Sequence, residues 1–266
     1  MSALDILLPA FVFAGLMVVT HTWLGLHVLA RGIIFVDLAL AQAAALGAVC
    51  AFLIDGDMHG WRARLFALGG ALLAGFGFSL LRRVADKTAR EVVIGAAYVV
   101  ATALSVLALS RSVQGMEALK TLLNGSILWV SWTEIAVVAA AYAALAALAV
   151  AARRQFHALS FGDGGGRHGW ELAFFAAFAV VITLSVGAAG VLLVFACLII
   201  PAFCASLLVA GFGARLGLGI ALGLVGSAGG LALAYAADLP VGASVVAALG
   251  ALLPLSALAR QAAGRA

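Results

Sequence analysis

Charged side chains are scarce in this chain. Only 10% of its 266 residues are Asp, Glu, Lys or Arg, whereas 66% are hydrophobic, and the mean hydropathy is +1.22. A soluble domain usually carries about 25% charged residues, which help to cover its surface with polar groups. The shortage excludes a large water-soluble fold, and it predicts that lipid surrounds most of the protein.

Cysteine is rare too. Cys50, Cys197 and Cys204 all lie within apolar runs, and no two of them form a Cys-x-x-Cys pair. This pattern supports neither a disulfide framework nor a zinc knuckle, and we expect Cys197 and Cys204 to serve in packing. The net charge of +4 comes without a dense basic patch, which argues against nucleic-acid binding.

Lysine is almost missing. Lys87 and Lys120 are the only two, and neither follows a glycine, so the chain has no Walker A motif. It also lacks His-Glu-x-x-His and Gly-x-Ser-x-Gly, the signatures of common zinc proteases and serine hydrolases. We therefore predict that the chain is not an enzyme, and that any ATPase that drives it is a separate polypeptide.

Long apolar runs are abundant. A helix needs about 20 apolar residues to cross a bilayer. The nine predicted spans are residues 6–29, 33–54, 65–84, 92–110, 127–151, 172–186, 191–209, 216–236 and 241–259. Only residues 187–190 separate the sixth span from the seventh, so eight spans is the alternative. The runs lack the period-two alternation of barrel strands, which predicts a single all-α domain, a polytopic helical bundle over residues 1–266.

The basic residues divide unevenly between the two sides of this bundle. If the N-terminus lies outside, 11 of the 15 Lys and Arg residues fall on the inner side. Inner loops of membrane proteins are enriched in Lys and Arg, so we predict an external N-terminus and an internal C-terminus. Residues 153–171 form the longest polar stretch and contain three successive glycines, which predicts a flexible inner loop.

Strongly polar side chains inside the spans are few, and they are the candidates for an ion pathway: His21, His27, Asp37 and Gln42. The two histidines lie six residues apart, or about 120° around a helix, so they do not form a metal clamp on one face. Three of these residues also have structural interpretations. His27 could be a histidine at the membrane interface, Asp37 could pair with Arg31, and Gln42 could link helices by hydrogen bonds.

Five stretches of the sequence carry recognisable motifs, at residues 25–47, 91–110, 123–132, 186–205 and 238–246. Their order and content resemble the integral-membrane permease of the zinc/manganese/iron ABC importer family. In the first stretch, Arg31, Phe35, Asp37, Leu46 and Gly47 match the family pattern of an arginine, Phe-x-Asp and a closing Leu-Gly. The fourth stretch is similar to the family segment that ends in Ile-x-Pro-Ala.

The resemblance implies a homodimer of permeases, multi-pass in the cytoplasmic (inner) membrane of a bacterium. Each permease would dock on a cytoplasmic ABC ATPase subunit and receive its ion from an extracytoplasmic metal-binding protein. By the same resemblance, the stretch around Pro201 looks like the turn into the helix that contacts the ATPase. Pro201, Ala202 and Ser206 are therefore the candidates for coupling to the ATPase.

One departure from the family pattern concerns the ion pathway. Many members carry a histidine four residues after the aspartate, whereas Ala41 stands there in this chain and Gln42 follows it. The Asp/His pair is therefore broken, and the residues of any tight metal site stay unknown. Either His21 substitutes from the neighbouring helix, or the ion is not held there, or the substrate differs.

Together, these patterns predict a permease that imports a divalent metal ion by alternating access, with no permanently bound cofactor. Zinc, manganese and iron are not separated by the sequence. The ion would enter near the outer loops that hold Asp57, His59 and Asp238. Two alternatives stay open: an ABC permease for a siderophore or vitamin, and a membrane enzyme or scaffold.

Overall fold

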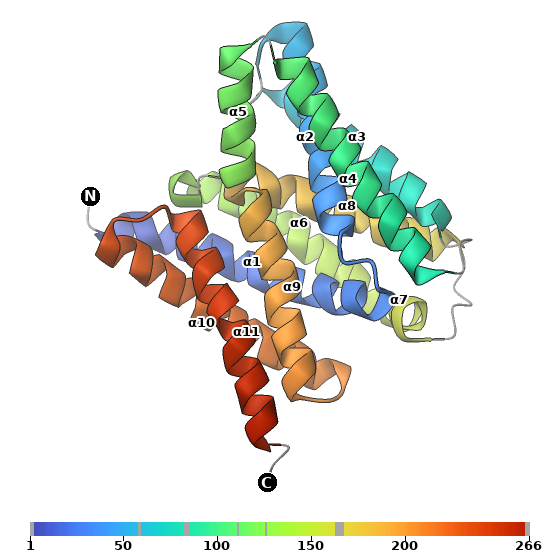
Figure 1. The fold of residues 1–266 in the computed structure, drawn as a ribbon, viewed down its shortest axis with the longest axis vertical. Coiled ribbons are helices and arrows are strands. Elements are labelled where there is room, and N and C mark those ends of the chain that lie inside the picture. The colour runs from blue at the N-terminus through green and yellow to red at the C-terminus, as the bar shows by residue number, and fades with distance from the viewer. Residues whose placement is uncertain are drawn as a thin grey trace. The chain divides into compact units, whose positions relative to one another are not determined.

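The computed structural model describes residues 3–57, 60–81, 86–110, 112–125, 127–162 and 168–263. Within these ranges the chain forms eleven α-helices and the 3-10 helix η2, and no strand (Figure 1). The elements are α1 (Ala3–Arg31), α2 (Val36–Asp55), α3 (Trp61–Leu80), α4 (Lys87–Leu109), α5 (Val113–Asn124), η2 (Ile127–Trp129), α6 (Trp132–Ala151), α7 (Arg153–Phe161), α8 (His168–Ala189), α9 (Val191–Leu208), α10 (Phe212–Ala237) and α11 (Val241–Ala263). Contacts between residues divide the chain into two compact units.

Nine helices of the described chain are long and apolar enough to cross a membrane, which confirms the all-α fold and the count of nine spans. The alternative of eight spans is wrong because α8 ends at Ala189 and α9 begins at Val191. Gly190 separates them with a φ of 79°. A backbone in this left-handed region suits glycine, which has no Cβ to collide with its neighbours.

The first unit comprises Met1–Leu29, Asn124–Ala146 and Ala188–Ala266, and thus contains most of α1 and α6 together with all of α9, α10 and α11. The last three helices, orange to red in Figure 1, pack against one another. Glycines permit close approach: a Cβ at Gly25 of α1 would collide with the carbonyl of Leu198 in α9. Such small-residue contacts are the usual way in which membrane helices pack tightly.

The second unit comprises Ala30–Leu123 and Ala147–Gly187, with α2 at its centre. Helix α2 packs against α3 and α4 (Figure 1). Glycines again mark the contact: a Cβ at Gly47 of α2 would collide with the carbonyl of Phe66, and one at Gly70 of α3 would collide with that of Ala43. Because glycines of both helices face the partner's backbone, α2 and α3 form the closest pair in this unit.

Two helices lie where the sequence predicted only connections. Helix α5 follows the fourth span and packs Met116 and Leu119 against a hydrophobic cluster from α2, α3 and α4. Helix α7 occupies the first half of residues 153–171, so the expectation of a flexible loop is wrong there. Phe156 explains this helix, because its buried ring lies 5.9 Å, centroid to centroid, from the ring of Trp170 in α8.

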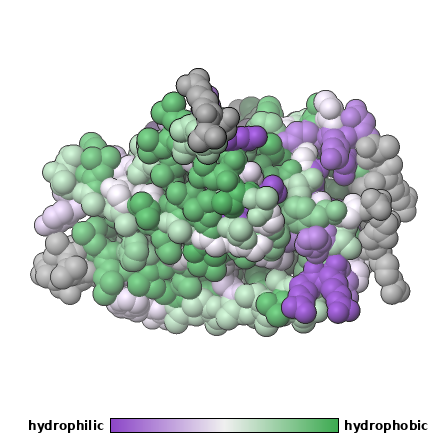
Figure 2. Space-filling view, turned by 90° about the horizontal axis from the view of Figure 1, so that it is seen from below, coloured by the Kyte–Doolittle hydropathy of each residue, from purple (hydrophilic) through white to green (hydrophobic). Residues whose placement is uncertain are grey.

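Large apolar side chains are widely exposed. Leu73, Leu107 and Val150 have 74%, 69% and 68% of their surface accessible. Hydrophobic residues cover most of the face drawn in Figure 2, while hydrophilic residues gather toward one side of it. Soluble proteins rarely expose extended apolar patches, so this surface agrees with a multi-pass membrane protein.

Candidate ion pathway

Asp37 is the most unusual side chain of the second unit. It lies in the first turn of α2 and is 1% exposed. Neither of its carboxylate oxygens has a hydrogen-bond partner among the described residues. A buried carboxylate without partners is costly, and such a group in a membrane protein is a candidate for a functional role.

The expected ion pair between Asp37 and Arg31 is not formed. Arg31, in the last turn of α1, instead pairs with Glu171 in the first turn of α8, and both side chains are buried. The Arg31 guanidinium carbon lies 4.6 Å from the ring centroid of Phe174 and 5.3 Å from that of Phe175. Arg31 thus pairs through one nitrogen with Glu171 and not with Asp37, while its Nη1 has no hydrogen-bond partner among the described residues. The structural interpretation of Asp37 as the partner of Arg31 is therefore wrong.

Glu91 contacts the backbone just before Asp37. Helix α2 begins without a side-chain cap of its own. The carboxylate of Glu91, in α4, accepts a hydrogen bond of 2.9 Å from the backbone N–H of Phe35, at the start of α2. A negative charge at a helix N-terminus is stabilising, so Glu91 fixes the turn that precedes Asp37.

Glu91 and Glu171 were not among the residues predicted from the sequence to have a role. Glu91 belongs to a motif that resembled the permease family, and Glu171 stands beside the start of the sixth span. Both are isolated acidic residues next to long apolar runs, and this was the signal available in the sequence. The identity of their partners was not available, because each partner lies on a different helix.

The two histidines of α1 belong to the first unit. His21 is fully buried, and its Nδ1 lies 2.9 Å from the carbonyl oxygen of Met17, while its ring centroid lies 6.2 Å from that of Tyr142. His27 is 2% exposed, with its ring 4.5 Å from Trp23 and 5.4 Å from Phe212, centroid to centroid. His27 is thus packed among aromatic rings and does not extend to the surface as an interfacial side chain would.

Gln42 is 2% exposed within α2. It lies five residues after Asp37, which places the two side chains about 140° apart around an ideal helix. They therefore point to different sides of α2, and a single ion cannot bind both on one helix face. Ala41, which stands where the family histidine is expected, is also buried.

Two of the three predicted entry residues lie in the described ranges. Asp57 accepts a hydrogen bond of 3.1 Å from the backbone N–H of Gly60, just before α3. Asp238 is exposed and follows α10 in the left-handed conformation, with φ 50°. His59 lies outside the described residues. Asp57 belongs to the second unit and Asp238 to the first.

The predicted turn at Pro201 is wrong, because α9 continues through Pro201 to Leu208. Pro201 and Ala202 are buried, and Ser206 is partly exposed and donates a hydrogen bond of 2.8 Å to the carbonyl of Ala202. The chain turns only after Leu208. There, Nε of Arg215 donates a hydrogen bond of 3.1 Å to the carbonyl of Val209.

Clusters suited to tight metal binding are absent from the described ranges. No three His, Cys, Asp or Glu side chains among those residues lie close enough together to hold one ion. The four candidate residues of the ion pathway are instead distributed singly over α1 and α2. Singly placed ligands suit brief contacts along a path, since a tight site would trap the ion.

Comparison with known proteins places the whole chain. Residues 3–260 match the family described as the ABC 3 transport family, while no curated protein matches. The fold resembles PsaBC from Streptococcus pneumoniae in complex with Fab, with a TM-score of 0.75, 19% identity, and 94% of this chain and 90% of that chain covered. It also resembles an ABC transporter described as of the metal-chelate type, in an inward-facing conformation, with a TM-score of 0.67, 16% identity, and 97% and 88% covered.

At identities this low, the likeness to the two solved structures shows that the fold is shared and no more. The family match is stronger evidence, because it covers eight candidate spans in full, the ninth up to residue 260, and the five stretches that resembled an importer permease. This protein therefore belongs to the ABC 3 transport family.

Proposed function

We propose that this chain is the permease subunit of an ABC importer that moves divalent metal ions across the cytoplasmic membrane of a bacterium. The observation that carries the proposal is Asp37, a buried carboxylate whose two oxygens lack hydrogen-bond partners among the described residues. A cation is the natural partner for such a group. Membership of the ABC 3 transport family supports the transport role, as does the fold shared with PsaBC and with an ABC transporter described as of the metal-chelate type.

The chemistry of the path favours a small cation. Asp37 and Gln42 offer oxygen ligands, which suit manganese, whereas His21 and His27 offer imidazole nitrogen, which suits zinc and iron. We propose that each of these residues contacts the ion only in passing. Asp57, His59 and Asp238 stay the candidates for the outer entry, and no tight site is assigned.

The partners follow from what the chain lacks. Without a Walker A motif, it depends on a separate cytoplasmic ATPase, and an extracytoplasmic binding protein would deliver the ion. We propose that residues 1–266 form one transmembrane domain that works as a homodimer with an external N-terminus. The end of α9, with Pro201, Ala202 and Ser206, and the turn after Leu208 would transmit the movement of the ATPase.

The test removes the charge of the Asp37 carboxylate and keeps the shape of the side chain. Asp37→Asn removes the charge from the proposed path, and we expect ATP-dependent metal uptake by proteoliposomes that contain the permease and its ATPase to fall at least about tenfold, a loss of about 1.4 kcal/mol of cation stabilisation. Asp86→Asn is the matched control. Asp86 caps α4 by accepting a bond from Thr88 N, and asparagine caps equally well.

Uptake by the Asp37→Asn variant at the level of the Asp86→Asn control would remove Asp37 from the path. Both proteins should purify with the ATPase in equal amounts, which shows that the loss arises in transport and not in assembly.

A metal chelate is the second candidate substrate, because one of the two similar structures is described as a metal-chelate type transporter. Competition distinguishes the two. If the free ion is taken up and an excess of its siderophore complex does not inhibit this uptake, the substrate is the ion. If only the complex is taken up, the substrate is the chelate.

A further inference from the structure

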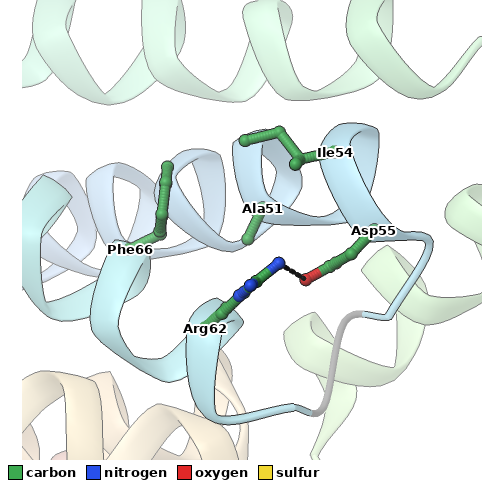
Figure 3. Close-up of a pocket in the computed structure, with 5 residues that line it drawn as sticks. All are labelled: Ala51, Ile54, Asp55, Arg62 and Phe66. Atoms are coloured by element: carbon green, nitrogen blue, oxygen red, sulfur yellow. Dashed lines mark ion pairs between the residues drawn. The ribbon is translucent and has the colours of Figure 1, made fainter.

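We propose that a cavity between the end of α2 and the start of α3 binds the headgroup of a zwitterionic aminophospholipid, phosphatidylethanolamine being the probe. The cavity has a volume of about 190 Å³ and is lined by Ala51, Ile54, Asp55, Arg62 and Phe66 (Figure 3). Sites for whole small molecules measure about 300–1,000 Å³. This cavity is smaller, so it fits one part of a larger molecule.

The cavity has an apolar wall and a charged mouth. Ala51 and Ile54 come from α2 and Phe66 from α3, and Ile54 and Phe66 are 68% and 43% exposed. Across from them, the side chains of Asp55 and Arg62 point toward each other (Figure 3). A phospholipid has the same sequence of groups, with charges in the headgroup followed by apolar chains.

The charged pair is loose. Nη1 of Arg62 lies 3.8 Å from Oδ2 of Asp55, and the two side chains are 55% and 27% exposed. A guanidinium has five N–H donors, so Arg62 retains donors for a phosphate, which it can bind through two parallel hydrogen bonds. The Asp55 carboxylate can in turn accept hydrogen bonds from an ammonium group.

The local charge balance selects the class of lipid. Of the residues that line the cavity, one is acidic, Asp55, and one is basic, Arg62. A neutral neighbourhood does not attract a net anionic headgroup. It matches a zwitterion, in which a phosphate meets Arg62 and an ammonium meets Asp55.

The position along the spans also fits a lipid headgroup. Asp55 is the last residue of α2, and Trp61 is the first of α3. Trp61 is 68% exposed, and the Arg62 guanidinium carbon lies 5.5 Å from its ring centroid. Exposed tryptophans concentrate at the level of the headgroups, so the cavity opens where spans leave the membrane.

Native mass spectrometry of the purified full-length protein, with bound lipid supplied as phosphatidylethanolamine or phosphatidylglycerol, tests this site. We expect wild type to retain one phosphatidylethanolamine per protomer in preference to phosphatidylglycerol. In Arg62→Gln, the occupancy of phosphatidylethanolamine should fall about fivefold, a loss of about 1 kcal/mol in binding free energy. Arg64→Gln is the matched control, since Arg64 is exposed on the same helix and does not line the cavity.

A second variant separates lipid recognition from a structural role. Asp55→Asn removes the partner of the ammonium and leaves Arg62 uncompensated, so the preference should move from phosphatidylethanolamine to the anionic lipid. A mere loss of stability would lower the retention of both lipids together. The proposal is overturned if wild type retains the two lipids equally, or if Asp55→Asn keeps the preference of wild type. The Asp55→Asn result tests the proposal even if Arg62→Gln fails to fold.

Discussion

Buried charges in this protein fall into two kinds at the scale of single residues. Arg31 and Glu171 pair with each other, and each lies at the helix end that favours its sign, a cation in the last turn of α1 and an anion in the first turn of α8. Asp37 has no such partner in the described chain. The contrast separates a charge pair that joins two helices from a buried carboxylate without a partner, which we propose meets the transported cation.

The Arg31–Glu171 pair makes a prediction about stability. Glu171→Gln leaves the arginine buried without its counter-charge, and removal of one partner from a buried pair costs about 3–5 kcal/mol. We expect a clear fall in the apparent melting temperature of the detergent-solubilised protein. Thermal unfolding followed by tryptophan fluorescence measures it.

A double replacement provides the control. Arg31→Met together with Glu171→Leu removes both charges and fills the site with apolar groups, which is often neutral. The double variant should therefore be more stable than Glu171→Gln alone. If the single variant melts at the same temperature as wild type, the pair does not hold α1 to α8.

At the scale of helices, glycine placement sets how closely the spans approach. Gly229 and Gly230 are neighbours in α10, yet their surroundings differ. A Cβ at Gly230 would collide with the backbone of Val245 in α11, whereas one at Gly229 would meet nothing within 4 Å. The α10–α11 contact thus depends on one of two adjacent glycines.

This difference predicts opposite effects of the same substitution. Gly230→Ala forces backbone apart, and overpacking of this kind costs about 1–3 kcal/mol. Gly229→Ala should be neutral or stabilising by up to about 1 kcal/mol, because alanine is the better helix former. Melting temperatures of the two variants, measured in parallel, give the answer, and equal values would show that α10 and α11 do not approach as closely as described.

The spans themselves were predictable from the sequence, because each is a continuous apolar run and lipid imposes a minimum length. Helices α5 and α7 were not, since they are short and owe their stability to contacts of Leu119 and Phe156 with other helices. The turn expected at Pro201 followed from family resemblance, yet the proline lies within α9. In the candidate site, Asp37 was predicted from its position in a span and stays a candidate, while the partner of Arg31 could be recognised only from the fold.

For the whole molecule, the uneven distribution of Lys and Arg predicts the orientation in the membrane. We expect the C-terminus on the cytoplasmic side. A green fluorescent protein fused after residue 266 should therefore be fluorescent, and alkaline phosphatase fused at the same point should be inactive. An active phosphatase with a dark fluorescent protein would reverse the orientation, and with it the assignment of outer entry and inner coupling residues.

The central claim, that this protein is the permease of a divalent metal importer, is tested most directly by uptake of radioactive zinc and manganese in cells that lack the chain and any homologous permease. We predict that uptake of at least one of the two ions falls to background, and that the wild-type chain restores it only when the ATPase partner is also present. Full uptake of both ions without the chain would contradict the claim.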